Sequence, residues 1–296
     1  MKALIKRWGL FLTINLLVLA VLGFIMQLIG IPSGDWINLL IYCAIFGFAG
    51  AIISLFASKA MAKSSYKITP LTRETATGKA RYLYDTIEKM AAHKGIKMPE
   101  FGIYQSPDNN AFATGASKHK SLIAFSSGIM HNLDEDELAA VAGHEMTHVT
   151  EGDMVTTTLL MGTMNTFVLF LANVLAAVLS GRRGQRDESS GSSGIMNNAG
   201  QSAIAMILQN VLMILANIVL AAHSRHREFI ADAGSAELTS PGHMITALEK
   251  ISGAHVHTTR KDAFAIAKIN SKQIMSLFAT HPPIEKRIEA LRKLMV

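Results

Sequence analysis

The sequence has little cysteine, little charge and few aromatic residues. Cys43 is the single cysteine among 296 residues and lies in an apolar run, which excludes an intramolecular disulfide framework and a thiolate zinc cage. Only 17% of the residues are charged, whereas soluble domains have about a quarter, so an ordinary cytosolic globule is not expected. Basic residues flank apolar stretches and do not alternate with aromatic ones, so no nucleic-acid partner is expected.

Apolar residues are abundant instead, at 50% of the chain, and this excludes a disordered protein. Four stretches lack Asp, Glu, Lys and Arg, and they cover residues 8–31, 36–58, 154–181 and 204–222. About 20 apolar residues are needed to cross a bilayer as a helix. The first three stretches are long enough, and the fourth, which contains three amide side chains, is borderline.

The first two apolar stretches predict a transmembrane hairpin, because only Pro32–Asp35 separates them. Basic residues precede and follow this hairpin, while its tip contains one acid and no base. The positive-inside rule therefore places both ends of the hairpin, and the segment after it, in the cytoplasm.

The third and fourth stretches form a second pair, joined by a Gly-, Ser- and Asn-rich loop at residues 181–203 that we expect to be flexible. Three arginines in this loop argue against its export. Two alternatives follow: the pair spans the bilayer twice, or it is re-entrant and packed against protein.

The remaining polar sequence predicts helices and a few short strands. The first polar block predicts a helix over 72–94 and a second over 134–151, whose first turn is acidic. Between them, strands are expected at 101–105, 110–114 and 121–126. The second block predicts helices from Arg225, around 244–252 and from Pro282 onward, the last with Thr280 as its cap.

A metal-binding motif, His-Glu-Met-Thr-His, lies in the second of these helices, from His144 to His148. Two histidines four residues apart project from one helix face and can bind one tetrahedral Zn²⁺. Glu145 lies about 100° around the helix, where it can act as the general base of a metalloprotease. A catalytic zinc takes three protein ligands, so a third one must come from elsewhere in the chain.

Glu228 is the best candidate for this third ligand. It shares one face of a predicted helix with Asp232, and small residues such as Gly234 permit close helix packing there. Asp232 is then placed to accept the free ring N–H of a zinc-bound histidine and fix its tautomer. His223 and His226 are rival third ligands, and a surface carboxylate or a carboxylate in the first turn of a helix is the alternative for Asp232.

One ion held by these ligands has a topological consequence. His144, His148 and Glu228 must lie on one side of the membrane, so the chain between them crosses it twice or not at all. We therefore divide the chain into an N-terminal hairpin, a first protease segment, a second apolar pair and a second protease segment. The expected limits are 1–63, 64–153, 154–222 and 223–296.

Four segments together carry a family resemblance: His144–His148, Glu228–Asp232, Asn110–Gly115 with the sequence Asn-Ala-Phe-Ala-Thr-Gly, and Thr280–Pro283 with the sequence Thr-His-Pro-Pro. The chain resembles the HtpX family of bacterial, heat-shock-associated inner-membrane zinc metalloproteases, which are gluzincins related to the CAAX prenyl proteases. The resemblance covers essentially the whole chain.

This resemblance implies a membrane endopeptidase with one Zn²⁺ per chain that degrades misfolded or damaged membrane proteins on the cytoplasmic side of the bacterial inner membrane. The expected partners are unfolded membrane proteins and the lipid bilayer. It also implies that substrate lies along an edge strand, a mode of binding that suits broad sequence tolerance. The strand residues are Asn110, Ala111, Phe112, Ala113 and Thr114, and an ordinary strand and turn is the alternative.

The Thr-His-Pro-Pro segment supplies a second catalytic candidate, His281. It either stabilises the oxyanion or only links a cap to the last helix. Arg287 follows in the same region and can pair with an acid.

The expected fold is a mostly α integral membrane protein, with two hydrophobic helical hairpins and a cytoplasmic α+β zincin-like protease domain that contains a small sheet. One alternative is a narrow-specificity processing protease of the CAAX prenyl type. The other is a non-enzymatic membrane protein with structural zinc, which is disfavoured because the lone cysteine is far from the motif in sequence and structural sites usually contain cysteine.

Overall fold

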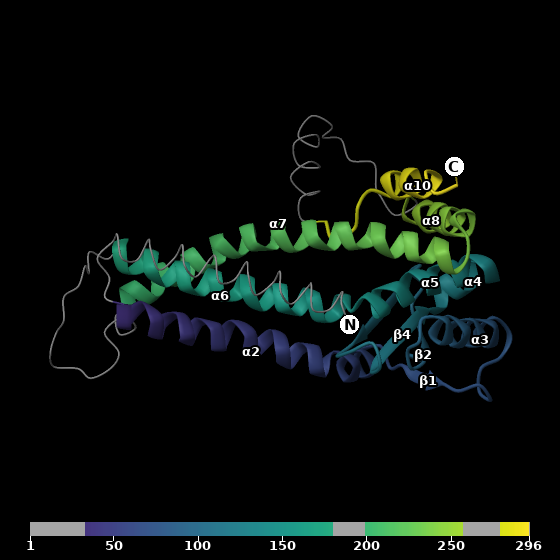
Figure 1. Cartoon of the computed structure of the whole chain (residues 1–296), viewed down its shortest axis with the longest axis horizontal. Coiled ribbons are helices and arrows are strands. Elements are labelled where there is room, and N and C mark those ends of the chain that lie inside the picture. Colours follow the sequence, from purple (N-terminus) through teal and green to yellow (C-terminus); the bar gives the residue numbers. More distant parts are fainter. Residues whose placement is uncertain (1–32, 180–198, 257–278, 296) are drawn as a thin grey trace. The chain divides into compact units, whose positions relative to one another are not determined.

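The computed structural model describes residues 33–179, 199–256 and 279–295. The predicted apolar stretch at 8–31 and most of the predicted loop at 181–203 lie outside these residues. The chain divides into two compact units, residues 1–49 with 162–216 and residues 50–161 with 217–296. Three long helices, drawn in Figure 1, contribute residues to both units.

These three helices are α2 (Ser33–Ser65), α6 (Asp153–Leu179) and α7 (Ala199–Leu238). Each is long and apolar enough to cross a membrane, within Trp36–Ser65, Asp153–Leu179 and Ser202–Leu238. Many of their large apolar side chains are exposed, including Ile45, Phe56 and Ile207, as lipid-facing side chains would be. The prediction of a mostly helical membrane protein is confirmed.

In the first unit, α2 and α6 pack closely. Leu39 and Cys43 of α2 form a buried cluster with Phe170 and Val174 of α6. A Cβ at Gly47 would lie 2.6 Å from the backbone nitrogen of Thr166, so only glycine permits this helix approach.

The second unit contains a four-stranded sheet in the order β1-β2-β4-β3. The strands are β1 (Thr69–Leu71), β2 (Glu100–Tyr104), β3 (Ala111–Gly115) and β4 (Ser121–Ser126). β2 and β4 are parallel, and β1 and β3 add antiparallel to the two sides. β3 is therefore an edge strand, and the three strands predicted from sequence are confirmed to within one residue.

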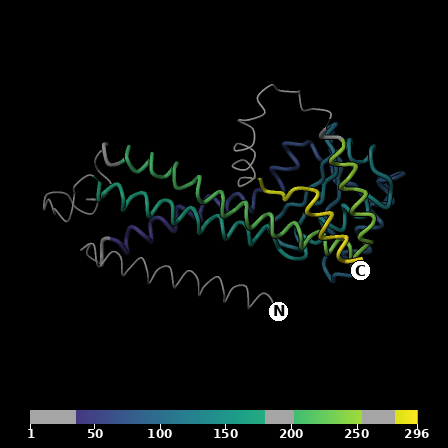
Figure 2. The backbone as a smooth tube through the Cα atoms, turned by 90° about the horizontal axis from the view of Figure 1, so that it is seen from above, coloured from purple at the N-terminus to yellow at the C-terminus, as the bar shows by residue number. Residues whose placement is uncertain are grey.

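Helices cover one face of this sheet. The core contains Leu83 and Ile87 of α3 (Gly78–His93), Phe125 of β4 and Met146 of α5 (Glu135–Glu151). The short helix α4 (Ser127–Asn132) follows β4 and leads into α5. Helices α8 (Pro241–Val256) and α10 (Ile284–Arg292) lie side by side, as Figures 1 and 2 both show, and pack through Leu248 and Leu291.

Particular residues determine where α5 begins and ends. Asp134 is the N-cap and forms a capping box with Glu137, which satisfies two backbone N–H groups at the helix start. Gly152 ends the helix in the left-handed conformation, with φ of 69°, where glycine has no steric cost. The predicted helix over 134–151 is confirmed.

Three predicted helix boundaries are wrong. The helix expected from residue 72 begins at Gly78, because residues 69–71 pair with β2 and the turn after them is closed by Ala76 N–H bonding to Thr72 O at 3.0 Å. Arg225 lies inside α7, because no proline interrupts this helix between residues 199 and 238. Thr280 does not cap the last helix, whose N-cap residue is Pro283 without a side-chain cap bond.

Candidate metal centre

His144 and His148 lie one turn apart on α5, and their Nε2 atoms are 3.2 Å from each other. A carboxylate holds the opposite nitrogen of each ring: His144 Nδ1 is 2.9 Å from Asp232 Oδ1, and His148 Nδ1 is 2.7 Å from Asp153 Oδ2. Since an ionised carboxylate only accepts hydrogen bonds, each Nδ1 carries the ring proton. Both Nε2 atoms therefore face the same space, where each can give its electron pair to a metal ion that takes the place of any proton on it.

Glu228 of α7 brings its carboxylate to the same space. Its Oε2 is 3.6 Å from His144 Nε2, and its Oε1 is 3.4 Å from His148 Nε2. One ligand atom from each of the three residues lies within 4.8 Å of the others, and Glu228 is only 3% exposed. Within the described part of the chain, this group of possible metal ligands does not include the rivals His223 and His226.

The donor set of this cluster fits a catalytic divalent metal. Two unprotonated imidazole nitrogens and one carboxylate would repel each other in a buried space unless a positive charge, either a proton or a metal ion, lay between them. Two histidines and one glutamate are also a ligand set of catalytic zinc. The residues present therefore match the metal that the motif predicts.

The pKa values of the histidines also indicate that the cluster attracts positive charge. Burial lowers the pKa of the His148 imidazole, but the Asp153 and Glu228 carboxylates outweigh burial and raise this pKa to about 10. A hydrogen bond with Glu228 likewise raises the pKa of the His281 imidazole above its ordinary value. The negative potential that holds these protons also favours a metal cation.

Arg287 of α10 lies behind the cluster and is buried. Its Nε and Nη2 donate to the two oxygens of Asp232 at 2.7 and 2.6 Å, in a bidentate pair. Its Nη1 is 3.2 Å from Glu228 Oε2. The last helix thus fixes the carboxylate that holds His144. From the sequence we expected Arg287 to pair with an acid, and the structure identifies that acid as Asp232.

His281 lies at the rim of the cluster. Its Nδ1 is 2.8 Å from Glu228 Oε2, and its side chain is 67% exposed, whereas that of Glu228 is 4% exposed. Because Nδ1 is engaged by Glu228, Nε2 is the ring atom available to donate a hydrogen bond outward.

Two residues of the centre were missed in the sequence. Asp153, the first residue of α6, holds His148, and Arg227 of α7 pairs with Asp153 Oδ1 through an Nη2 atom 2.5 Å away. The signal for Asp153 was Gly152, which ends α5 in a left-handed conformation and turns the next residue back toward the motif.

Small residues let α7 approach α5 beside the cluster. A Cβ at Gly234 would lie 2.3 Å from Thr147 Oγ1. Ser235 is fully buried, and its Oγ donates to Ala140 O at 2.6 Å. The close helix packing expected at Gly234 is therefore present.

The predicted substrate strand is β3, and it packs on α5 through Ala111 and Ala113. Asn110 O accepts from Ser126 N at 2.9 Å, so residues 110, 112 and 114 direct their backbone groups toward β4. Backbone groups alternate along an antiparallel strand. Ala111 and Ala113 therefore direct theirs to the free edge.

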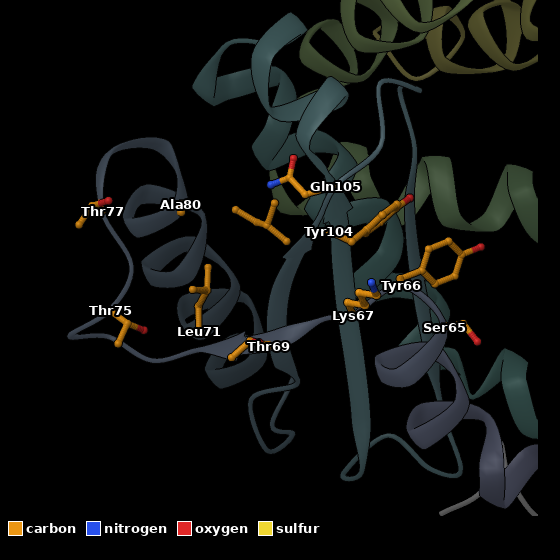
Figure 3. A pocket seen from close by; sticks show the side chains of 11 residues that line it. Ser65, Tyr66, Lys67, Thr69, Leu71, Thr75, Thr77, Ala80, Tyr104 and Gln105 are labelled. Carbon is orange, nitrogen blue, oxygen red and sulfur yellow. The ribbon is translucent and has the colours of Figure 1, made fainter.

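The opposite face of the sheet carries an aromatic cluster, and a cavity lies beside it. Phe112 of β3 contacts Tyr66 and Tyr104, with ring centroids 5.4 and 5.7 Å away. Figure 3 shows Tyr66 and Tyr104 beside a cavity of about 710 Å³, which is lined by the end of α2 and the turn after it, by β1 and the loop that follows it, by the start of α3 and by the end of β2. His144, His148 and Glu228 are not among its lining residues, so this cavity is separate from the metal cluster.

The fold and this site define a membrane-embedded metallopeptidase. Residues 78–295 match peptidase family M48. The chain is 44% identical over 285 residues to Protease HtpX of Haemophilus influenzae (strain PittEE), covering 96% of this chain and 98% of that protein. It is 45% identical over 297 residues to Protease HtpX of Tolumonas auensis, covering 98% and 99% of the two chains.

The chain belongs to peptidase family M48 and, within it, to the HtpX proteases. The crystal structure of S. mikatae Ste24p has the same fold, with a TM-score of 0.63 at 18% sequence identity. The match covers 98% of this chain and 65% of the Ste24p chain. The predicted membership of the HtpX family is confirmed.

Proposed function

We propose that this chain is a zinc-dependent endopeptidase that hydrolyses peptide bonds of unfolded or damaged membrane proteins at the cytoplasmic face of the bacterial inner membrane. The proposal rests on one observation: His144, His148 and Glu228 form a cluster whose ligand atoms lie within 4.8 Å of one another. The proposal includes one Zn²⁺ per chain.

The cluster residues would hold the zinc through His144 Nε2, His148 Nε2 and the Glu228 carboxylate. When bound, Zn²⁺ polarises the scissile carbonyl and makes water a better nucleophile near neutral pH. Asp232 and Asp153 keep the ring protons on Nδ1, so that the Nε2 atoms stay available as ligands.

Glu145 follows His144 on α5 and is 8% exposed. We assign it the general-base role: a carboxylate oxygen accepts a proton from the attacking water and then delivers it to the nitrogen of the leaving amine. His281 Nε2 is assigned to donate a hydrogen bond to the oxyanion that develops on the carbonyl oxygen.

The edge of β3 is assigned to bind the substrate backbone. Among the described residues no strand pairs with the outer side of β3, so the backbone N–H and C=O groups of Ala111 and Ala113 can pair with an added strand. Main-chain pairing recognises no particular side chain, and this supports broad substrate choice over one processing site.

The assignment is tested with Glu145→Gln in the full-length chain in detergent. We expect zinc content equal to wild type and loss of cleavage of an unfolded membrane protein, because the amide cannot accept the proton. Retained cleavage would overturn the general-base role. Cleavage of one site in one protein, with other unfolded membrane proteins left intact, would favour a narrow processing protease.

A further inference from the structure

We propose that Asp153 is a positioning residue of the metal centre, with Arg227 as its counter-ion, so that the first residue of α6 sets the orientation of His148. This inference rests on the proposed function in one respect, which is that His148 binds the metal.

The chain geometry that brings Asp153 to His148 is specific. The two residues are five apart in sequence, and in an uninterrupted helix they would point about 140° away from each other. Gly152 ends α5 with φ of 69°, and α6 begins at the next residue. This break turns the Asp153 carboxylate back onto His148 Nδ1, at 2.7 Å.

The two oxygens of Asp153 have separate partners. Oδ2 contacts His148, and Oδ1 lies 2.5 Å from Arg227 Nη2. Both side chains are 11% exposed. Burying a carboxylate is costly unless a counter-charge lies beside it, and Arg227 supplies that counter-charge.

The order of charged groups around His148 is the same as around His144, although Arg287 makes two hydrogen bonds to its carboxylate and Arg227 makes one ion-pair contact. His144 is held by Asp232, which is held by Arg287. His148 is held by Asp153, which is held by Arg227. Each metal-binding histidine thus has its own carboxylate and each carboxylate its own arginine. The recurrence argues that Asp153 serves the histidine and is not only a helix-start residue.

The physical effect of Asp153 is to fix the His148 tautomer and ring plane. A carboxylate that accepts from Nδ1 keeps the ring proton on that nitrogen and directs Nε2 toward the other metal ligands, and its charge raises the basicity of Nε2. Loss of such a partner typically costs 10- to 100-fold in metal affinity.

The test compares Asp153→Asn with Glu151→Gln in full-length protein in detergent. Glu151 lies 3.5 Å from the same Arg227 Nη2, so its variant removes an acid from the same arginine while leaving His148 Nδ1 held by Asp153. Zn²⁺ affinity is measured by competition with a chromogenic chelator after metal removal, and the visible absorption spectrum is recorded after Co²⁺ loading. The spectrum reports ligand geometry, which a general loss of stability would not change.

We expect Asp153→Asn to weaken Zn²⁺ binding roughly 10- to 100-fold and to alter the Co²⁺ spectrum, while Glu151→Gln stays near wild type. Arg227→Gln is the second variant if Asp153→Asn does not fold, and it should weaken binding while Arg227→Lys restores it. Wild-type affinity and spectrum in Asp153→Asn, or in Arg227→Gln if that variant is used, would overturn this inference alone. Failure of the wild-type chain to bind Zn²⁺ would overturn the proposed function as well.

Discussion

Replacement of Gly234 by alanine is expected to separate α7 from α5 at the metal centre. The added Cβ would lie 2.3 Å from Thr147 Oγ1 and 2.6 Å from Thr147 Cγ2. The hydroxyl of Thr147 also donates to Gly143 O at 2.8 Å. Because both branches of the threonine meet the new methyl group, rotation of the side chain cannot relieve the clash and the helix must move.

The size of the effect follows from these distances. Overpacking of this kind costs roughly 1–3 kcal/mol, and the better helix propensity of alanine offsets about 1 kcal/mol. The net loss of folding stability is therefore about 0–2 kcal/mol. Ordinary van der Waals contact requires α7 to shift by about 1 Å, while metal–ligand distances tolerate about 0.2 Å. Glu228 lies on the same helix, so we expect metal affinity to fall at least tenfold.

The assay combines thermal unfolding in detergent with Zn²⁺ competition. Thr147→Ala is the matched control, and in Gly234→Ala/Thr147→Ala the nearest remaining atom of residue 147 is Cβ, at 3.0 Å. A shift of a few tenths of an ångström accommodates that contact, so the double variant should recover most of the affinity. Wild-type Zn²⁺ affinity in Gly234→Ala, or no recovery in the double variant, would refute the reasoning.

Two further predictions concern the edge strand and the start of α5. Ala113→Pro removes one outward N–H. Because one main-chain hydrogen bond contributes about 0.5–1.5 kcal/mol, kcat/KM for an unfolded substrate should fall about two- to tenfold while the zinc content stays normal. The control Thr114→Pro breaks pairing with β4 and should instead lower the melting temperature. Equal kcat/KM in Ala113→Pro and wild type would contradict substrate pairing at this strand. A hydrogen bond from the Glu137 backbone N–H holds the pKa of Asp134 below its ordinary value. The ionised Asp134 cap therefore stabilises the folded protein at neutral pH, and this contribution is lost as the pH falls below about 4. Asp134→Ala should cost about 1 kcal/mol at pH 7, measured by thermal unfolding, and a deficit that stays constant on acidification would refute the charge-dependent cap.

The sequence correctly placed site residues on one helix face where both members of a pair lie in the same helix. His144 and His148 are four residues apart, as are Glu228 and Asp232, and helical periodicity alone places each pair on one face. The glycine at 152 and the acids after residue 134 marked the limits of α5 for local reasons. The division of the chain at residues 63, 153 and 222 stays a prediction.

The parts that sequence could not predict depend on tertiary contacts. Residues 69–71 form a strand only because β2 lies beside them, so the start of α3 was placed too early. Asp153 was missed because a spacing of five has no meaning within a continuous helix. Arg287 reaches Asp232 across 55 residues, a distance over which no periodicity applies.

The continuity of α7 gives this protein a fixed helical phase. Within the second unit, the apolar side chain of Val219 is exposed on the same unbroken helix that presents Glu228 and Asp232. One inserted residue upstream of Glu228 would rotate these carboxylates by about 100° relative to that apolar surface. Seven inserted residues, two turns, would restore the phase to within about 20°. Insertions of different length would therefore act periodically on metal binding.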